Sequence, residues 1–246
     1  MGRLDNKIIL VTGGNGLLGS AIVANIRDEG GICINLDINH DTSSDFSSIW
    51  CDITDTNSIN STIELIINKF NRIDGLVNNA YPRTEDWGLK FENIDYKSWQ
   101  INVDWQLNSH FYITQEVSKY MVNQGSGSIV NMASIYGIVG PDFTVYEGTE
   151  MTMPAAYSAI KGAIINFSRY LAAYLGPKGV RVNTVSPGGI FDNQNLLFVS
   201  NYNKKVPLRR MGYPIDISPS VSFLLSNESN YITGQNLIID GGWTSI

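Results

Sequence analysis

Short apolar runs bounded by Gly or Asp recur along the chain. They cover residues 7–12, 31–37, 74–78, 128–133, 180–186 and 236–240. Between them, residues 17–27, 58–70, 104–122 and 155–175 carry apolar side chains at helical spacing. Parallel strands need a crossover between neighbours, so this alternation predicts an α/β fold whose mostly parallel sheet of about seven strands carries helices on both faces.

The chain shows no repeat, no low-complexity tract and no linker rich in Pro or Ser. We therefore expect one domain over residues 1–246. Its least regular segments, 81–95, 135–154 and 189–212, each follow the carboxyl end of an expected strand. A doubly wound parallel sheet binds its ligand at that edge, so the ligand site is expected there.

Composition narrows the function. Apolar residues make up 43% of the chain and charged residues 16%, as in globular proteins. With 23 acidic against 17 basic residues the net charge is -6, which argues against binding to nucleic acid or to an anionic membrane. No apolar run approaches the roughly 20 residues of a membrane span, and no signal-length segment precedes Gly13. A cytoplasmic protein is expected.

Cysteine and histidine are too sparse for a metal site. Cys33 and Cys51 form no Cys-x-x-Cys pair and are interpreted as reduced core residues. His40 and His110 lie 70 positions apart, without a second ligand at metal spacing. No protein-bound metal is expected.

A glycine-rich turn follows the first expected strand. Residues 12–19 read Thr-Gly-Gly-Asn-Gly-Leu-Leu-Gly and open the first helix. Glycines let the backbone approach a pyrophosphate, which the helix N-terminus attracts, although a plain strand-to-helix turn also uses glycine. Asp37 ends the second strand, 18 residues after Gly19, near the position where a carboxylate meets the adenosine ribose. The pair favours a Rossmann-type dinucleotide site over a solvated turn aspartate.

Asp37 also bears on which dinucleotide binds. A carboxylate about 4 Å from a 2′-phosphate costs up to about 4 kcal/mol at an effective dielectric of about 20, or roughly three decades in affinity. Residues 15–20 and 37–42 contain no Lys or Arg to offset it. NAD is therefore favoured over NADP.

Tyr157 and Lys161 share one face of an expected helix, one turn apart. A phenol with a pKa near about 10 needs about 4 kcal/mol of anion stabilisation to accept protons near neutral pH. One ammonium about 4 Å away supplies a similar energy, so we expect Lys161 to lower the pKa of Tyr157. Tyr and Lys at this spacing also occur by chance on exposed helices.

Ser134 and Asn102 make the pattern specific. With them the chain resembles the single-domain short-chain dehydrogenase/reductase family over nearly its whole length. The ordered matches are residues 12–19, Asp52, 78–80, 102–103, Ser134, 157–161, Asn183, 187–188, 210–212, 233–235 and 240–242.

The resemblance implies an enzyme that interconverts a secondary alcohol and a ketone with a nicotinamide cofactor. It implies that Tyr157 exchanges a proton with the substrate oxygen, Ser134 hydrogen-bonds that oxygen, Lys161 holds the nicotinamide ribose and Asn102 anchors a relay water. The cofactor-binding residues implied are Gly13, Asn15, Gly16, Leu17, Gly19, Asp37, Asp52, Ile53, Asn79, Ala80, Tyr157, Lys161, Pro187, Gly188 and Ile190. A homotetramer or homodimer built through residues 104–122 and 155–175 is also implied.

Three departures from the family pattern bear on the substrate. Leu17 stands where the family usually has its second glycine, as in the extended branch that modifies sugar nucleotides. Tyr81 replaces the glycine that commonly follows Asn-Asn-Ala, and Pro82 and Arg83 come after it. Ser134 and Tyr157 are separated by 22 residues, more than in most relatives. The inserted loop, 137–154, is expected beside the active site, where it either contacts substrate or forms a solvent-facing excursion.

The mixed polar, aromatic and acidic residues of this insertion suit a polyhydroxylated ligand. With Tyr81, Pro82 and Arg83 the chain is similar to reductases of flagellin-modification and nonulosonic-acid sugar pathways. Residues 189–212 are expected to form the substrate loop. Two alternatives stay open: a sugar-nucleotide epimerase or dehydratase that retains NAD, and a cofactor-binding protein without turnover.

Overall fold

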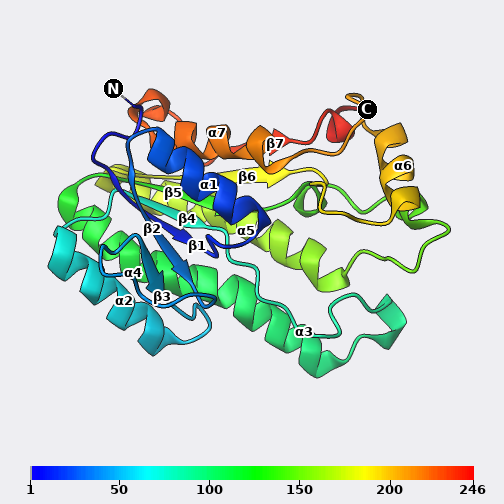
Figure 1. Ribbon diagram of the computed structural model, residues 1–246, viewed down its shortest axis with the longest axis horizontal. Coiled ribbons are helices and arrows are strands. Elements are labelled where there is room, and N and C mark those ends of the chain that lie inside the picture. The colour runs from blue at the N-terminus through cyan, green and yellow to red at the C-terminus, as the bar shows by residue number, and fades with distance from the viewer. Residues whose placement is uncertain (1) are drawn as a thin grey trace.

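A seven-stranded sheet, parallel throughout, forms the centre of the computed structural model, which describes residues 2–246. Its order is β3-β2-β1-β4-β5-β6-β7 (Figure 1). The strands are β1 (Ile8–Thr12), β2 (Ile32–Asp37), β3 (Ser48–Trp50), β4 (Gly75–Asn78), β5 (Gly127–Met132), β6 (Val180–Pro187) and β7 (Asn236–Ile239). The predicted doubly wound α/β fold is confirmed.

Helices cover both faces of the sheet (Figure 1). They are α1 (Leu17–Asp28), α2 (Thr56–Phe70), α3 (Tyr96–Val103), α4 (Ser109–Gln124), α5 (Ala155–Leu175), α6 (Leu196–Lys205) and α7 (Pro214–Leu225). α1 and α7 pack on one face and α2, α4 and α5 on the other, while α6 lies beyond the strand ends. Within residues 2–246 no helix has both the length and the hydropathy of a membrane span.

Alternate residues of the central strands β1, β2, β4, β5 and β6 build two separate cores. In β1, Ile8 and Leu10 join the cluster under α2, α4 and α5, whereas Ile9 and Val11 join the cluster under α1 and α7. All four side chains are at most 3% exposed. Burial on both faces explains why the strands appear in the sequence as continuous apolar runs.

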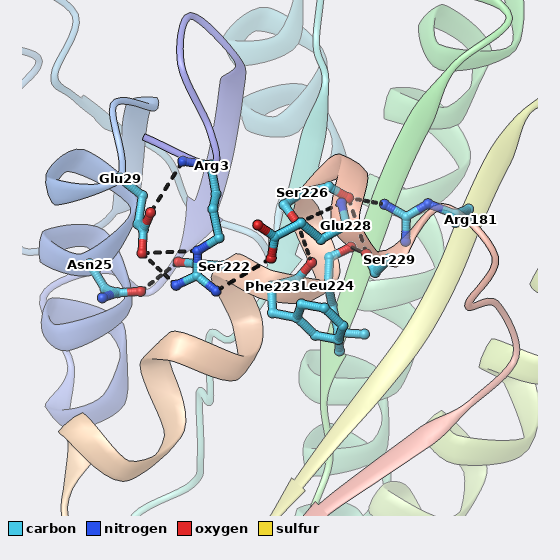
Figure 2. Close-up of polar contacts among 10 residues, drawn as sticks. All are labelled: Arg3, Asn25, Glu29, Arg181, Ser222, Phe223, Leu224, Ser226, Glu228 and Ser229. Carbon is cyan, nitrogen blue, oxygen red and sulfur yellow. Dashed lines mark hydrogen bonds and ion pairs between the residues drawn. The ribbon is translucent and has the colours of Figure 1, made fainter. Parts of the chain in front are cut away.

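Polar contacts tie the helices together at the amino-terminal edge of the sheet (Figure 2). Ser222 Oγ of α7 donates to Asn25 Oδ1 of α1 at 2.6 Å. Arg181 Nη2 at the start of β6 donates to the carbonyl of Ser226 at 3.0 Å. Arg3 and Glu29 form an ion pair at the same edge. These contacts stabilise the edge opposite the one where the ligand site was predicted.

One helix differs from its prediction in an informative way. Residues 104–122 were expected to be regular, but α3 continues into a π-helical turn, Asp104–Asn108, before α4 begins. A π-turn is often found at functional positions, because it changes which side chains share a helix face. Here it turns Gln106 and His110, which are 1% and 3% exposed, toward the protein interior.

Candidate active site

A cleft of about 860 Å³ opens at the carboxyl-terminal edge of the sheet. Its lining begins at Gly13 after β1 and includes the segments that follow β2, β4, β5 and β6. All three irregular segments predicted to flank a ligand, 81–95, 135–154 and 189–212, contribute residues to it.

The glycine turn after β1 forms one end of the cleft. A Cβ at Gly13, where φ is +65°, would lie 2.7 Å from Ala80 Cα, and one at Gly19 would lie 2.1 Å from the Gly13 carbonyl oxygen. Gly16, the N-cap of α1, places no side chain on the first N–H groups of that helix, and the first turn carries no acidic residue. A diphosphate fits this turn, because it needs close backbone approach and free N–H donors.

Asp37 lies at the cleft with its carboxylate held in place. Oδ2 accepts from the Asn15 N–H at 2.9 Å and Oδ1 from the Asn39 N–H at 3.0 Å, and the side chain is 6% exposed. A carboxylate fixed in this way is suited to accept hydrogen bonds from a ribose diol.

Most of the predicted cofactor-binding residues share this cleft. The lining includes Gly13, Gly16, Leu17, Gly19, Asp37, Asp52, Ile53, Asn79, Ala80, Tyr157, Lys161, Pro187, Gly188 and Ile190. Asn15 is the exception: its N–H orients Asp37 and its side-chain oxygen accepts from Asn35 Nδ2 at 2.8 Å. Asn15 therefore acts on the position of the carboxylate and not on the cleft itself.

Ser134, Tyr157 and Lys161 line the other end of the cleft. Ser134 follows β5, and its Oγ accepts from the Tyr136 N–H at 3.2 Å, which leaves the hydroxyl proton free to be donated. Lys161 Nζ donates to the Met132 carbonyl at 2.9 Å and lies 5.5 Å from the centre of the Tyr157 ring.

Gly137 allows the segment that carries Ser134 to pack closely on α5, which carries Tyr157 and Lys161. A Cβ at Gly137 would lie 2.6 Å from the carbonyl carbon of Lys161 and 2.8 Å from the Gly162 nitrogen. The segment that carries Ser134 therefore packs backbone against backbone on α5, one turn from Tyr157.

Burial is the main cause of the pKa shifts of both Tyr157 and Lys161. It raises the pKa of Tyr157, against which a hydrogen bond from Ser134 acts, and it lowers the pKa of Lys161 to about 8. The pKa of Tyr157 is therefore raised, and not lowered as predicted, because desolvation is the largest influence on it. The tyrosine is held as a neutral phenol, the form that donates a proton.

The fold does not place Asn102 in the cleft with Ser134, Tyr157 and Lys161. Its Nδ2 donates to Thr84 Oγ1 at 2.7 Å and to the Ser98 carbonyl at 2.9 Å, and its Oδ1 accepts from the Thr84 N–H. The side chain is 2% exposed and does not line the cleft. Asn102 ties the loop after β4 to α3.

Gln106 and His110 were not singled out as site residues from the sequence. Gln106 Nε2 donates to the Pro82 carbonyl at 2.9 Å, and His110 Nε2 lies 3.4 Å from the Ala80 carbonyl. Burial lowers the pKa of His110 to about 3, so the ring is neutral. The available signal was weak: Gln106 and His110 are four positions apart and so share a helix face, but Asn108, Ser109 and other polar residues surround them in the sequence.

These two side chains fix the path of the backbone around Tyr81. The Tyr81 ring packs edge-on against Tyr157 with centroids 5.6 Å apart, and Lys161 Nζ lies 5.6 Å from its centre. Trp87 packs edge-on against both tyrosines. Tyr81, which stands where a glycine was expected, is therefore in direct contact with the Tyr157 ring.

Comparison with known proteins places the chain among oxidoreductases. A family model described as enoyl-(acyl carrier protein) reductase matches residues 19–244. Post-translational flagellin modification protein A of Campylobacter coli is 36% identical over 98% of this chain and 99% of its own length. The 7alpha-hydroxysteroid dehydrogenase of Bacteroides fragilis is 30% identical over 99% and 96%. A short chain dehydrogenase from Leptospira borgpetersenii, solved with bound NAD+, superposes with a TM-score of 0.90 at 37% identity, over 98% of this chain and 94% of that one.

Proposed function

The chain belongs to the short-chain dehydrogenase/reductase family of oxidoreductases, and we propose that it uses NAD to interconvert a secondary alcohol and a ketone on a polar, sugar-like substrate. The observation that carries the proposal is the convergence of Ser134, Tyr157 and Lys161 at one end of a cleft whose other end is a glycine turn and a fixed carboxylate. The relatives named above include a flagellin modification protein and a steroid dehydrogenase. The substrate class therefore has to be inferred from this chain's own cleft.

The proposed roles follow from the hydrogen bonds already present. Ser134 Oγ, held by the Tyr136 N–H, donates its proton to the substrate oxygen and stabilises the charge that develops there. Tyr157 Oη gives its proton to that oxygen in reduction and takes it back in oxidation. Lys161 keeps two N–H donors beyond the one bound to Met132, and these suit the nicotinamide ribose. When bound, the nicotinamide accepts or supplies the hydride.

Asn102 is proposed here as a positioning residue rather than a member of the reacting group. It fixes Thr84 and Ser98, and Gln106 and His110 fix the backbone on either side of Tyr81. Together these side chains hold the loop after β4 against the catalytic tyrosine.

Exposed aromatic side chains support the homo-oligomer implied by the family. Tyr170 and Tyr174 on α5 are 62% and 57% exposed, and Phe167, Tyr170 and Tyr174 form a stacked row. A row of this kind suits a contact between copies of the chain, because large exposed apolar patches mark interaction surfaces.

The proposed activity is tested by mixing the purified protein with NADH and a panel of hydroxyketones and simple ketones. NADH is expected to be consumed in stoichiometric amounts with at least one carbonyl, with release of the alcohol. Binding of NADH without any turnover across the panel contradicts the proposal and favours a non-catalytic protein. NAD that stays bound through purification, with substrate converted but no net change in NADH, favours the epimerase or dehydratase alternative.

Replacing Asp37 by Ser is expected to shift the cofactor preference toward NADP. The fixed carboxylate repels a 2′-phosphate. Its removal is expected to lower the ratio of kcat/KM for NADH to kcat/KM for NADPH by about tenfold to thousandfold. Asp52→Asn is the matched control, because Asp52 lines the same cleft and its change is expected to act equally on both cofactors. An unchanged ratio in Asp37→Ser contradicts the proposed role.

A further inference from the structure

The insertion between Ser134 and Tyr157 is anchored to the protein. Val145 is fully buried in a cluster with Phe198, Tyr202 and Met211. Asp142 forms an ion pair with Lys205 of α6 at 2.9 Å, and Asn201 Nδ2 donates to the Glu147 carbonyl at 3.3 Å. The insertion therefore packs on α6, and the two segments form the outer wall of the cleft.

This wall brings tyrosines to the catalytic end of the cleft. Tyr136 follows Ser134, Tyr146 belongs to the insertion and Tyr202 to α6, and all three line the cleft together with Tyr157. The rings are held by packing: Tyr146 stacks on Phe198 with centroids 5.2 Å apart, and Tyr202 stacks on Trp243 at 4.5 Å.

The hydroxyls of these tyrosines differ in how well they are hydrogen-bonded. Tyr202 Oη accepts from the Gly189 N–H at 2.6 Å. Tyr146 Oη donates to the thioether of Met153 at 3.5 Å, a weak acceptor, and lies next to the Tyr136 hydroxyl. Tyr136 Oη is covered from solvent beside Tyr146 and makes no hydrogen bond of good geometry among residues 2–246. A buried hydroxyl without a well-formed hydrogen bond is unfavourable by about 1–3 kcal/mol, so a ligand oxygen that replaces Met153 at Tyr146 and lets the two tyrosines pair in sequence gains affinity.

Few charged residues line the cleft, and among them Lys161 lies beside Tyr157. Its acidic lining residues are Asp37 and Asp52 at the glycine-turn end and Asp192 on the loop after β6, and its basic ones are Lys161 and the exposed Arg83. Tyr136, Tyr146 and Met153 thus surround the place beside Tyr157 with neutral donors and a thioether. This lining matches an uncharged, hydroxyl-bearing part of a substrate.

We propose that Tyr136 and Tyr146 form a subsite that binds a hydroxyl on the carbon next to the reacting one, so that the enzyme selects vicinal hydroxyketones and diols. The inference rests on the proposed oxidoreductase function and names the substrate feature that this site selects. Exchanging Met153 for a ligand oxygen loses little, because the bond that Tyr146 gives up is weak.

The test compares acetoin and erythrulose, which carry a hydroxyl beside the carbonyl, with 2-butanone, which lacks it. In the wild-type protein kcat/KM is expected to be higher for the hydroxyketones. Tyr136→Phe and Tyr146→Phe are each expected to lower kcat/KM for the hydroxyketones by about tenfold to a hundredfold, with 2-butanone changed by less than about twofold. Tyr231→Phe removes a hydroxyl from a fully exposed side chain and serves as the control.

Each outcome has a distinct meaning. An equal loss of kcat/KM on all three ketones in Tyr136→Phe and Tyr146→Phe indicates a packing role and overturns the subsite. A higher wild-type kcat/KM for 2-butanone than for the hydroxyketones also overturns it. In both cases the proposed oxidoreductase activity stands. NADH consumption with none of the ketones in the wider panel overturns the proposed function itself, and the subsite with it.

Discussion

Tyr157→Phe is expected to lower kcat by about 10²- to 10⁴-fold while the Kd for NADH changes by less than about twofold. Phe keeps the edge-on contact with Tyr81 and removes only the hydroxyl that we propose gives its proton to the substrate oxygen. The measurements are steady-state reduction of the best ketone in the panel and NADH fluorescence titration of the same preparation.

Tyr231→Phe is the control, because the Tyr231 side chain is fully exposed and does not line the cleft. Its kcat is expected to stay within about twofold of wild type, as is usual for exposed substitutions away from a site. If Tyr157→Phe turns over at the wild-type rate, the hydroxyl does not carry the proton and the proposed mechanism is wrong.

Lys161→Met is expected to remove activity and, in the cofactor-free protein, to raise the free energy of unfolding at pH 7 by about 1–3 kcal/mol. Burial lowers the pKa of Lys161 from 10.5 to about 8, so the charged form destabilises the fold below pH 8 by about 3 kcal/mol. Loss of the hydrogen bond to Met132 offsets about 1 kcal/mol of that gain.

The same shift sets a pH dependence. Between about pH 8 and 10.5 the unfolded chain keeps the Lys161 proton and the folded protein releases it, so the wild type is expected to gain stability as pH rises through this window. Lys161→Met is expected to lack this component of the slope, and Lys97→Met, at an exposed position, to keep it. Urea unfolding at pH 7 and pH 10 measures both. A variant less stable than wild type at pH 7 contradicts the argument.

The regular part of the fold could be predicted because burial on both faces of the sheet leaves apolar runs in the sequence. β3 could not, since Ser48, Ile49 and Trp50 form a three-residue edge strand with only Ile49 buried. Nor could α3 and α6, which cover little of the sheet and have no clear apolar stripe. The π-turn at Asp104–Asn108 left no periodic signal at all.

In the site, too, features set by local sequence could be predicted, and features set by distant segments could not. Glycines, an acidic strand end and the Tyr–Lys spacing are local, so they pointed to the cleft correctly. The direction of the tyrosine pKa depends on desolvation by segments far away in the sequence, and the position of Asn102 depends on Thr84 and Ser98, which lie 18 and 4 residues away. The tyrosines of the outer wall come from three separate segments, and only the fold brings them together.

The bare backbone contact at Gly137 has a wider consequence. Because the backbone at Gly137 touches the backbone of α5, any larger residue at position 137 pushes the segment that carries Ser134 away from the helix that carries Tyr157. We therefore expect a change of substrate to involve the insertion and α6, which lie outside this backbone contact, rather than residue 137.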